Sequence, residues 1–265
     1  ASIYNRKFFQ DDKKIKIIHV EAGLRSFDER MPEEINRKLI DQLSNILFVP
    51  TRFDLKNLEK ERLTLNKKVF TVGNTISDII KTNVNLIKKN NILKNFNLIK
   101  KKFYLITLHR PETVDNPIKF YKLIMDFEKI GKKFETIFLF PVHPRTKKII
   151  KNLKFKKLSF IKFTEPLKFL DFLTIMKNSK IIFTDSGGIQ EESSLLGVPC
   201  ITIRTTTERQ LSLIKKTNIL TGYNYNKIFK AVTYFNKHKI KPSNVFGKGK
   251  VSNKIFEIIK KIDNN

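Results

Sequence analysis

The chain has 265 residues, 40% of them hydrophobic, and carries a formal net charge of +28. That length can build one large domain or two small ones. No apolar run approaches the roughly 18 residues that span a bilayer, and no signal-peptide pattern opens the chain, so we expect no membrane partner. Cys200 is the single cysteine, which excludes a disulfide framework within the chain and makes a cytoplasmic location the default expectation.

The positive charge would suit a nucleic-acid partner. However, most of the 53 basic residues are lysines spread along the whole chain. This distribution indicates solvated lysine faces, and no RNP, zinc or helix-turn-helix signature accompanies it, so we expect no nucleic-acid partner. The arginines are more informative, because their planar fork suits phosphate and carboxylate recognition. Six of them lie inside motif-like segments: Arg25, Arg37, Arg110, Arg145, Arg204 and Arg209.

Apolar strand-like runs alternate with amphipathic helical patterns, which is typical of an α/β fold with a parallel sheet. Strands are predicted at residues 15–20, 46–50, 69–72, 103–108, 136–142, 158–163, 181–184 and 200–204. Helices are predicted over residues 33–45, 52–62, 77–88, 117–131, 168–178 and 187–196. A last amphipathic helix is predicted from residue 251, with Val251, Ile255, Ile258 and Ile262 on one face.

A Lys- and Asn-rich stretch at residues 88–102 marks the expected domain boundary. We expect residues 1–90 to form the remainder of an N-terminal domain and residues 91–250 a C-terminal nucleotide-binding domain. Residues 251–265 would form a helix that can cross back to the first domain. The chain begins with Ala1 inside a helix-like pattern before its first strand, which predicts a fragment whose opening strands are missing.

The segment IIFTDSGGIQEE predicts a strand, a turn and a helix. Ser186 is a natural N-cap, and Gly187 and Gly188 would let a ligand approach the free backbone N–H groups at the helix start. Such a start binds anions, most often phosphate, and a carboxylate on the next turn could accept hydrogen bonds from ribose. A plain glycine turn, followed by acids that offset the helix dipole, explains the pattern equally well. Neither a Walker P-loop nor a G-x-G-x-x-G fingerprint is present, which argues against an ATPase or a dinucleotide enzyme.

Three of the four histidines stand where predicted strands end, at His19, His109 and His143. Arg110 and Arg145 follow two of them, and this pairing favours a polyanionic ligand. The histidines lack metal-ligand spacing, so we expect no metal.

Two carboxylates lie near the first predicted strand. Glu21 follows the strand directly, and the carboxyl end of a parallel strand is where α/β folds bind ligands. Glu33 follows Pro32 at a predicted helix start, where an acid is also routine helix-start chemistry.

The segments HVEAGLRS, MPEEINR, VGNT, HRPE, PVHPRT, TDSGGIQEE and TERQ, in this order, resemble the non-hydrolysing UDP-N-acetylglucosamine 2-epimerase family. The match covers almost the whole chain. The resemblance implies two Rossmann-like domains of GT-B type facing a cleft for a UDP-sugar, the N-terminal one incomplete here. It also implies a cytoplasmic homodimer without cofactor, which makes UDP-ManNAc from UDP-GlcNAc for cell-surface polysaccharide precursors.

The resemblance implies catalytic roles for Glu21, Glu33 and His109. It implies that Ser186, Gly187 and Gly188 hold the diphosphate, that Glu192 contacts the ribose, that Phe172 packs near the uracil and that Arg209 lines the cleft. The remaining expected substrate-binding residues are Arg110, His143 and Arg145.

The chain departs from the family pattern at Thr113, Gln210 and Lys216, which lie beside the motifs and affect the detail of substrate recognition. The family's Gly-Asp-Thr segment, whose aspartate belongs to the active site, would end just before Ala1.

Inverting C2 of an N-acetylhexosamine is difficult because its proton is not acidic. Without NAD, the remaining route breaks the C1–O bond to UDP, removes the C2 proton and then recombines the glycal with UDP. Three alternatives stay open: a GT-B glycosyltransferase, which would need an acceptor; a hydrolysing epimerase; and a nucleotide-binding fragment without activity.

Overall fold

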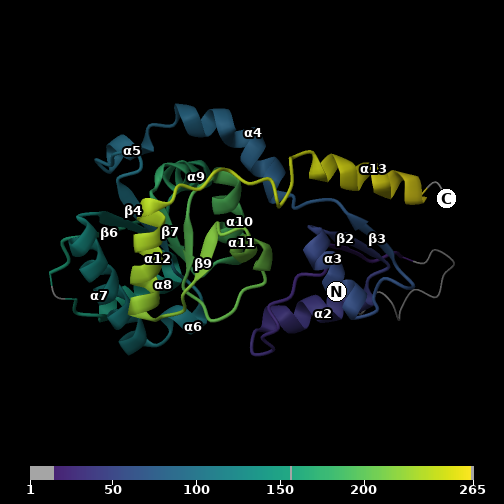
Figure 1. Cartoon of the computed structure of the whole chain (residues 1–265), viewed down its shortest axis with the longest axis horizontal. Helices are drawn as coiled ribbons and strands as arrows, with labels where there is room; N and C mark the ends of the chain where they lie inside the picture. The colour runs from purple at the N-terminus through teal and green to yellow at the C-terminus, as the bar shows by residue number, and fades with distance from the viewer. Residues whose placement is uncertain (1–14, 156, 264–265) are drawn as a thin grey trace. The chain divides into compact units, whose positions relative to one another are not determined.

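The computed structural model describes residues 15–155 and 157–263 (Figure 1). The helix-like pattern expected at the start of the chain lies outside the described residues. The chain divides into two compact units, one built from residues up to Ile79 together with those from Val245 onward, the other from Ile80 to Asn244. The helix α4 (Ile76–Lys89) begins in the first unit and continues into the second.

The first unit contains a parallel sheet of β1 (Ile18–Val20), β2 (Ile46–Val49) and β3 (Lys68–Thr71), with β2 in the centre. The helices α2 (Pro32–Leu43) and α3 (Arg52–Lys60) connect these strands. Alternate side chains of β2 point to opposite faces, as in any strand. Ile46 and Phe48 therefore join one apolar cluster, whereas Leu47 and Val49 join the other.

The last helix of the chain, α13 (Val251–Asp263), packs in the first unit. Val251, Ile255 and Ile262 are buried in the same cluster as Ile46, which is the face that the periodicity predicts. Asp78 on α4 accepts hydrogen bonds from the backbone N–H groups of Val251 at 2.9 Å and Ser252 at 2.8 Å. The carboxylate therefore caps the free donors at the start of α13.

The second unit contains a six-stranded, wholly parallel sheet in the order β6-β5-β4-β7-β8-β9. Its strands are β4 (Phe103–Thr107), β5 (Ile137–Pro141), β6 (Ile161–Thr164), β7 (Ile181–Thr184), β8 (Cys200–Thr202) and β9 (Asn218–Leu220). Its helices, besides α4, are α5 (Ile92–Asn95), α6 (Pro111–Val114), α7 (Pro117–Phe134), α8 (Pro144–Asn152), α9 (Phe169–Asn178), α10 (Gly187–Leu196), α11 (Gln210–Ile214) and α12 (Tyr225–Lys237).

Helices cover both faces of this sheet, because its strands are apolar on both sides. On β4, Tyr104 and Ile106 pack into the cluster formed with α7 and α12, whereas Phe103 and Leu105 pack into the cluster formed with α9 and α10. The predicted strands appear within a few residues of their expected positions. The predicted elements did not include β9 or the helices α5, α6, α8, α11 and α12. On α12 the buried residues Ile228, Ala231, Val232 and Phe235 recur at helical spacing, a signal that the sequence did carry.

The strand order creates a switch point between β4 and β7. From β4 the chain first builds β5 and β6 on one side, then returns to build β7 on the other side of β4. In open parallel sheets, the loops at the carboxyl ends of the strands part at such a point and leave a crevice that binds ligands. Within the described residues, no helix combines the length and apolar character needed to span a bilayer.

Candidate functional site

The loops after β4 and β7 meet at the switch point. His109 and Arg110 follow β4, and Asp185, Ser186 and Gly187 follow β7. The Asp185 carboxylate is fully buried and accepts hydrogen bonds from the backbone N–H groups of His109 at 3.0 Å and Arg110 at 2.9 Å. The structure thus brings the loop that carries His109 and the Ser186 turn together. The residue that joins them, Asp185, was not assigned a role from the sequence, although it stands directly before Ser186.

The start of α10 is open at Gly188. A Cβ built on this residue would meet no other atom within 4 Å, and its φ angle is not positive. Neither packing nor backbone conformation therefore requires glycine here. The first N–H groups of a helix have no partner within the helix, so they remain able to hold an anion at this open position.

Ser186 occupies the N-cap position of α10, as predicted, but its hydroxyl makes no capping hydrogen bond among the described residues. Its backbone N–H donates to Thr184 Oγ1 at 3.0 Å, which fixes the turn. The capping function assigned from the sequence is therefore wrong in detail. The hydroxyl is left to act as an additional donor toward a ligand.

Gly187 is packed against a buried polar network. The carboxylate of Glu208 occupies the space where a Gly187 Cβ would lie, and Arg209 Nε is 3.9 Å from the same position. Glu208 pairs with Arg204 at 3.1 Å, and Arg209 pairs with Glu191 at 3.0 Å. This network places Arg209 beside the turn. Neither pairing was predicted from the sequence. Arg209 and Glu191 come from different segments, whereas Arg204 and Glu208 lie four residues apart in the loop between β8 and α11.

Glu192 lies on the second turn of α10 and is partly buried. Burial raises the pKa of its carboxyl group to about 7 because a charged carboxylate loses solvation there. Near neutral pH the group can therefore both accept and donate hydrogen bonds. Phe172, on α9, is partly buried against the apolar cluster that includes Leu173.

His143 and Arg145 follow β5. The ring of His143 lies 5.5 Å from the ring of His109, measured between centroids, so two of the expected residues are neighbours. Arg145 is half-exposed and forms a two-pronged pair with Asp115, at 3.1 and 2.6 Å. A ligand would have to compete with Asp115 for this guanidinium group.

The first unit carries the other candidate residues, after β1 and at the start of α2. Glu21 directly follows β1 and adopts a φ angle of 69°, in the left-handed region. Glu33 is exposed on the first turn of α2. The local positions predicted for both carboxylates, at a strand end and a helix start, are those observed.

Arg25 lies in a motif-like segment, and the sequence suggested that it could recognise a phosphate or carboxylate ligand. The structure shows that it does not serve as a surface anion ligand. Its side chain is fully buried and pairs with Asp41 at 2.8 Å and Glu61 at 2.6 Å. His19 also contacts Asp41, with Nδ1 at 2.6 Å from Oδ1. These groups tie the loop after β1 to α2 and α3. Their charges are neutralised inside the unit.

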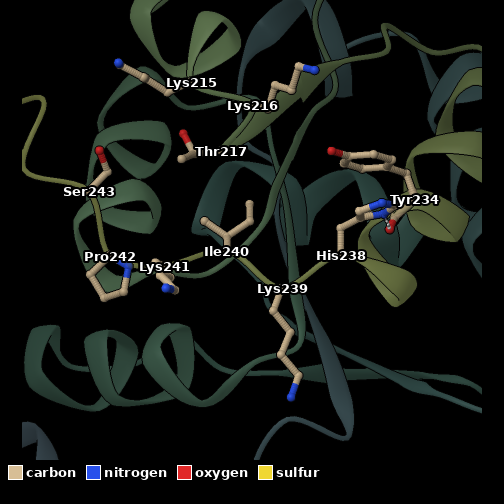
Figure 2. Close-up of a pocket in the computed structure, with 10 residues that line it drawn as sticks. All are labelled: Lys215, Lys216, Thr217, Tyr234, His238, Lys239, Ile240, Lys241, Pro242 and Ser243. Atoms are coloured by element: carbon tan, nitrogen blue, oxygen red, sulfur yellow. Dashed lines mark hydrogen bonds between the residues drawn. The ribbon is translucent and has the colours of Figure 1, made fainter.

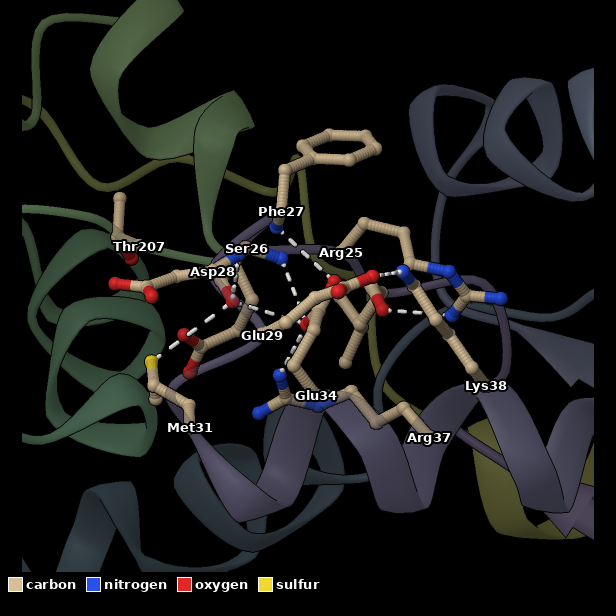
Figure 3. A network of polar contacts seen from close by, with 12 residues as sticks. Arg25, Ser26, Phe27, Asp28, Glu29, Met31, Glu34, Arg37, Lys38 and Thr207 are labelled. Atoms are coloured by element: carbon tan, nitrogen blue, oxygen red, sulfur yellow. Dashed lines mark hydrogen bonds and ion pairs between the residues drawn. The ribbon is translucent and has the colours of Figure 1, made fainter.

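Glu34 holds the loop that separates Glu21 from Glu33 (Figure 3). Its fully buried carboxylate accepts hydrogen bonds from the backbone N–H groups of Ser26 at 2.9 Å and Phe27 at 3.0 Å, and pairs with Arg37 at 3.0 Å. Burial alone would raise the pKa of Glu34, but these hydrogen bonds outweigh it and hold the pKa below the ordinary value. The sequence suggested only helix-start chemistry here. The structure shows that the buried Glu34 carboxylate holds the backbone of Ser26 and Phe27 to the start of α2, and we call these contacts the Glu34 clamp.

A cavity of about 360 Å³ lies elsewhere in the second unit (Figure 2). It is lined by Lys215, Lys216, Lys239 and Lys241, among others. These residues follow the ends of α11 and α12 or precede β9, so they lie at the amino-terminal edge of the sheet, opposite the switch point. Lysines at helix C-termini are accounted for by the negative end of the helix dipole. Among residues 15–155 and 157–263, no group of three or more His, Cys, Asp and Glu side chains could hold a metal ion.

The family model for UDP-N-acetylglucosamine 2-epimerase matches residues 11–260. The chain belongs to this family. A protein of Methanocaldococcus jannaschii named UDP-N-acetylglucosamine 2-epimerase is 44% identical over 253 residues, which are 93% of this chain and 69% of the relative. A Pseudomonas aeruginosa protein named UDP-2,3-diacetamido-2,3-dideoxy-D-glucuronate 2-epimerase is 34% identical, over 94% of this chain and 69% of its own length.

Solved structures agree with this assignment. The M. jannaschii UDP-GlcNAc 2-epimerase, crystallised in complex with UDP-GlcNAc and UDP, superposes with a TM-score of 0.86 at 43% identity, over 93% of this chain and 69% of that chain. The family and the α/β fold with two Rossmann-like domains of GT-B type, both predicted from the motifs, are confirmed.

Proposed function

We propose that the protein interconverts UDP-GlcNAc and UDP-ManNAc by eliminating and re-adding UDP, without a metal or a redox cofactor. The observation that carries this proposal is the switch point, where the open N-terminus of α10 lies beside His109. The proposed phosphate-binding helix start and the proposed proton-transfer group thus follow neighbouring strands, β7 and β4. The names of the family relatives and the UDP-GlcNAc complex of the M. jannaschii enzyme support the same substrate.

UDP would bind with its diphosphate at the start of α10. The Ser186 hydroxyl and the backbone N–H groups of Gly187 and Gly188 supply neutral donors, and the positive end of the helix dipole favours the anion. Glu192 would contact the ribose and Phe172 the uracil, while Arg209 would line the site. The remaining binding residues of the proposal are Arg110, His143 and Arg145.

The chemical step must break one bond to UDP and one bond to hydrogen. The C1–O bond breaks and its electron pair leaves with the diphosphate, which the helix start stabilises. A general base takes the C2 proton, and the C2–H electrons form the C1=C2 double bond of a glycal. Protonation of C2 from the opposite face, with return of UDP to C1, completes the inversion. Glu21, Glu33 and His109 would supply these proton transfers and stabilise the positive charge that develops at C1.

The protein would act in the cytoplasm as a homodimer and supply a precursor for cell-surface polysaccharide. A second candidate substrate is the corresponding diacetamido-uronic acid sugar nucleotide, favoured by the match to the P. aeruginosa protein. The Thr113 and Gln210 departures lie beside the motifs, where they can alter recognition of the sugar without altering the diphosphate site. Lys216 lies at the opposite edge of the sheet, so its departure does not bear on the sugar.

The test is turnover of each sugar nucleotide in deuterium oxide, followed by proton NMR. We expect UDP-GlcNAc to form UDP-ManNAc and to lose its C2 proton signal, without added metal or NAD. Glu21→Gln should abolish this exchange and leave UDP affinity, measured by calorimetry, within about threefold. Retention of the C2 proton during turnover would exclude elimination. Dependence on an added sugar acceptor would instead identify a glycosyltransferase.

A further inference from the structure

Asp185 combines complete burial with hydrogen bonds that, among the described residues, its carboxylate accepts from the loop after β4. Its Oδ2 accepts from the backbone N–H groups of His109 at 3.0 Å and Arg110 at 2.9 Å, and its Oδ1 lies 3.5 Å from His109 Nδ1. Burying a carboxylate costs several kcal/mol unless its partners compensate. Here all of these contacts are to the loop that carries His109, so the charge is used to fix that loop and its imidazole.

We propose that Asp185 is a positioning residue that fixes both the place and the tautomer of His109; this inference rests on the role of His109 in the proposed function. A carboxylate only accepts hydrogen bonds, so the nitrogen that faces it carries the proton. Nδ1 of His109 is then the N–H nitrogen. Nε2 keeps its lone pair and is the nitrogen available to take a proton from substrate.

The position of Asp185 in the chain adds a second consequence. It directly precedes Ser186 and Gly187, so the residue that orients the base is covalently joined to the turn that would hold the diphosphate. Proton transfer requires hydrogen-bond reach between base and substrate. With Asp185 as the link, His109 and the diphosphate keep a fixed separation. A shift of one loop without the other would break that geometry.

The first experiment compares Asp185→Asn with Glu128→Gln. Glu128 offers a matched control because its carboxylate also accepts two backbone N–H groups, those of Ser159 at 2.7 Å and Phe160 at 3.0 Å, away from the switch point. We expect Asp185→Asn to lower kcat by about tenfold to a hundredfold, the range for a misplaced catalytic group, with KM changed less than threefold. Glu128→Gln should leave both unchanged. Equal effects of the two variants would assign Asp185 a general structural role and overturn the proposal.

The second experiment reads the tautomer directly and needs no turnover. The chain has four histidines, so long-range nitrogen–proton NMR spectra can be assigned with single His→Gln variants. We expect His109 to carry its proton on Nδ1 in the unaltered protein and to show a mixture of tautomers in Asp185→Asn. A proton on Nε2 of His109 in the unaltered protein would overturn the proposal, whether or not the variant folds.

A double variant separates this inference from the proposed function. If Asp185 acts through His109, then Asp185→Asn should lower kcat no further in a His109→Gln background. Additive losses would overturn the inference while leaving the epimerase function intact. Conversely, full activity of His109→Gln would refute the catalytic role of His109, whereas the NMR spectra would still report whether Asp185 sets its tautomer.

Discussion

The Glu208 carboxylate occupies the space that a side chain at Gly187 would need. Glu208 cannot easily withdraw, because it is buried and paired with Arg204 at 3.1 Å. The adjacent Gly188 faces open space instead, with no atom within 4 Å of the position that a methyl group would take. Glycine therefore serves a different purpose at each of these two consecutive positions. One is required by packing, and the other leaves an approach for a ligand.

Gly187→Ala should destabilise the second unit. The added methyl group would overlap Glu208 Oε1 and force the buried pair with Arg204 to shift. Overpacking of this kind costs about 1–3 kcal/mol. The measurement is thermal or urea unfolding of the variant beside the unaltered protein. An unchanged midpoint would show that the Glu208 side chain relocates freely.

Gly188→Ala should leave the fold intact and weaken UDP binding. Replacing a helical glycine that has room for a methyl group stabilises a protein by about 0.5 kcal/mol. The same methyl group would stand over the N–H groups proposed to hold the diphosphate. We expect UDP affinity to fall at least tenfold by calorimetry, a loss of about 1.4 kcal/mol. Unchanged affinity in a well-folded variant would remove this helix start from the proposed site.

Glu34→Gln and Glu33→Gln should separate structure from catalysis at neighbouring positions. Glu34 is fully buried and holds Ser26 and Phe27, so loss of its charge should destabilise the first unit by about 3 kcal/mol. Glu33 is exposed, and its variant should keep the stability while losing epimerisation. Unfolding and turnover of each purified variant test this contrast.

The Glu34 clamp should also make the protein sensitive to acid. The pKa of Glu34 lies below the ordinary value of 4.5, so the folded state holds the ionised form more tightly than the unfolded state does. Its contribution is present above pH 4.5 and is lost as the pH falls through the lowered pKa. Glu34→Gln should lack this loss, so the stability difference between the two proteins should shrink in acid. A constant difference would contradict the clamp.

Glu192→Gln should stabilise the protein at alkaline pH and have little effect in acid. Burial raises the pKa of Glu192 to about 7 in the folded state, above the ordinary 4.5, so the folded state favours the protonated form. Stability is then lost as the pH rises from about 4.5 to about 7, by at most about 3 kcal/mol at 1.36 kcal/mol per unit. Gln cannot ionise and avoids this loss. Melting curves at pH 5 and pH 8 test the prediction.

Glu165→Gln is the matched control for this pH experiment. Glu165 is 74% exposed and lies in the same unit, in a surface pair with Lys147. Surface pairs of this kind contribute about 0–1 kcal/mol. We expect its variant to follow the unaltered protein at both pH values. If Glu192→Gln raised the stability equally at both pH values, removal of a buried charge could not be the cause of the gain.

The sequence by itself determined the local elements and the family. The apolar run 181–184, the two glycines and the following helix to residue 196 are observed as predicted, because strand burial, turn chemistry and a helix start are all encoded within a few residues. The strand ends that carry His109 and Glu21 were found in the same way. The ordered motifs identified the family because each depends on residue identity alone.

Only the tertiary structure decided which polar groups are used internally. Glu33 and Glu34 look equivalent in the sequence, yet a rotation of about 100° on the helix leaves one exposed and buries the other against Ser26 and Phe27. Arg25 looks like an anion ligand until Asp41 and Glu61, from α2 and the end of α3, are seen to neutralise it. Asp185 acquires its role in the same way, because the pairing of β7 with β4 brings it to His109, from which it is 76 residues away in the chain. Contacts between distant segments follow from packing the whole sheet, and no local pattern encodes them.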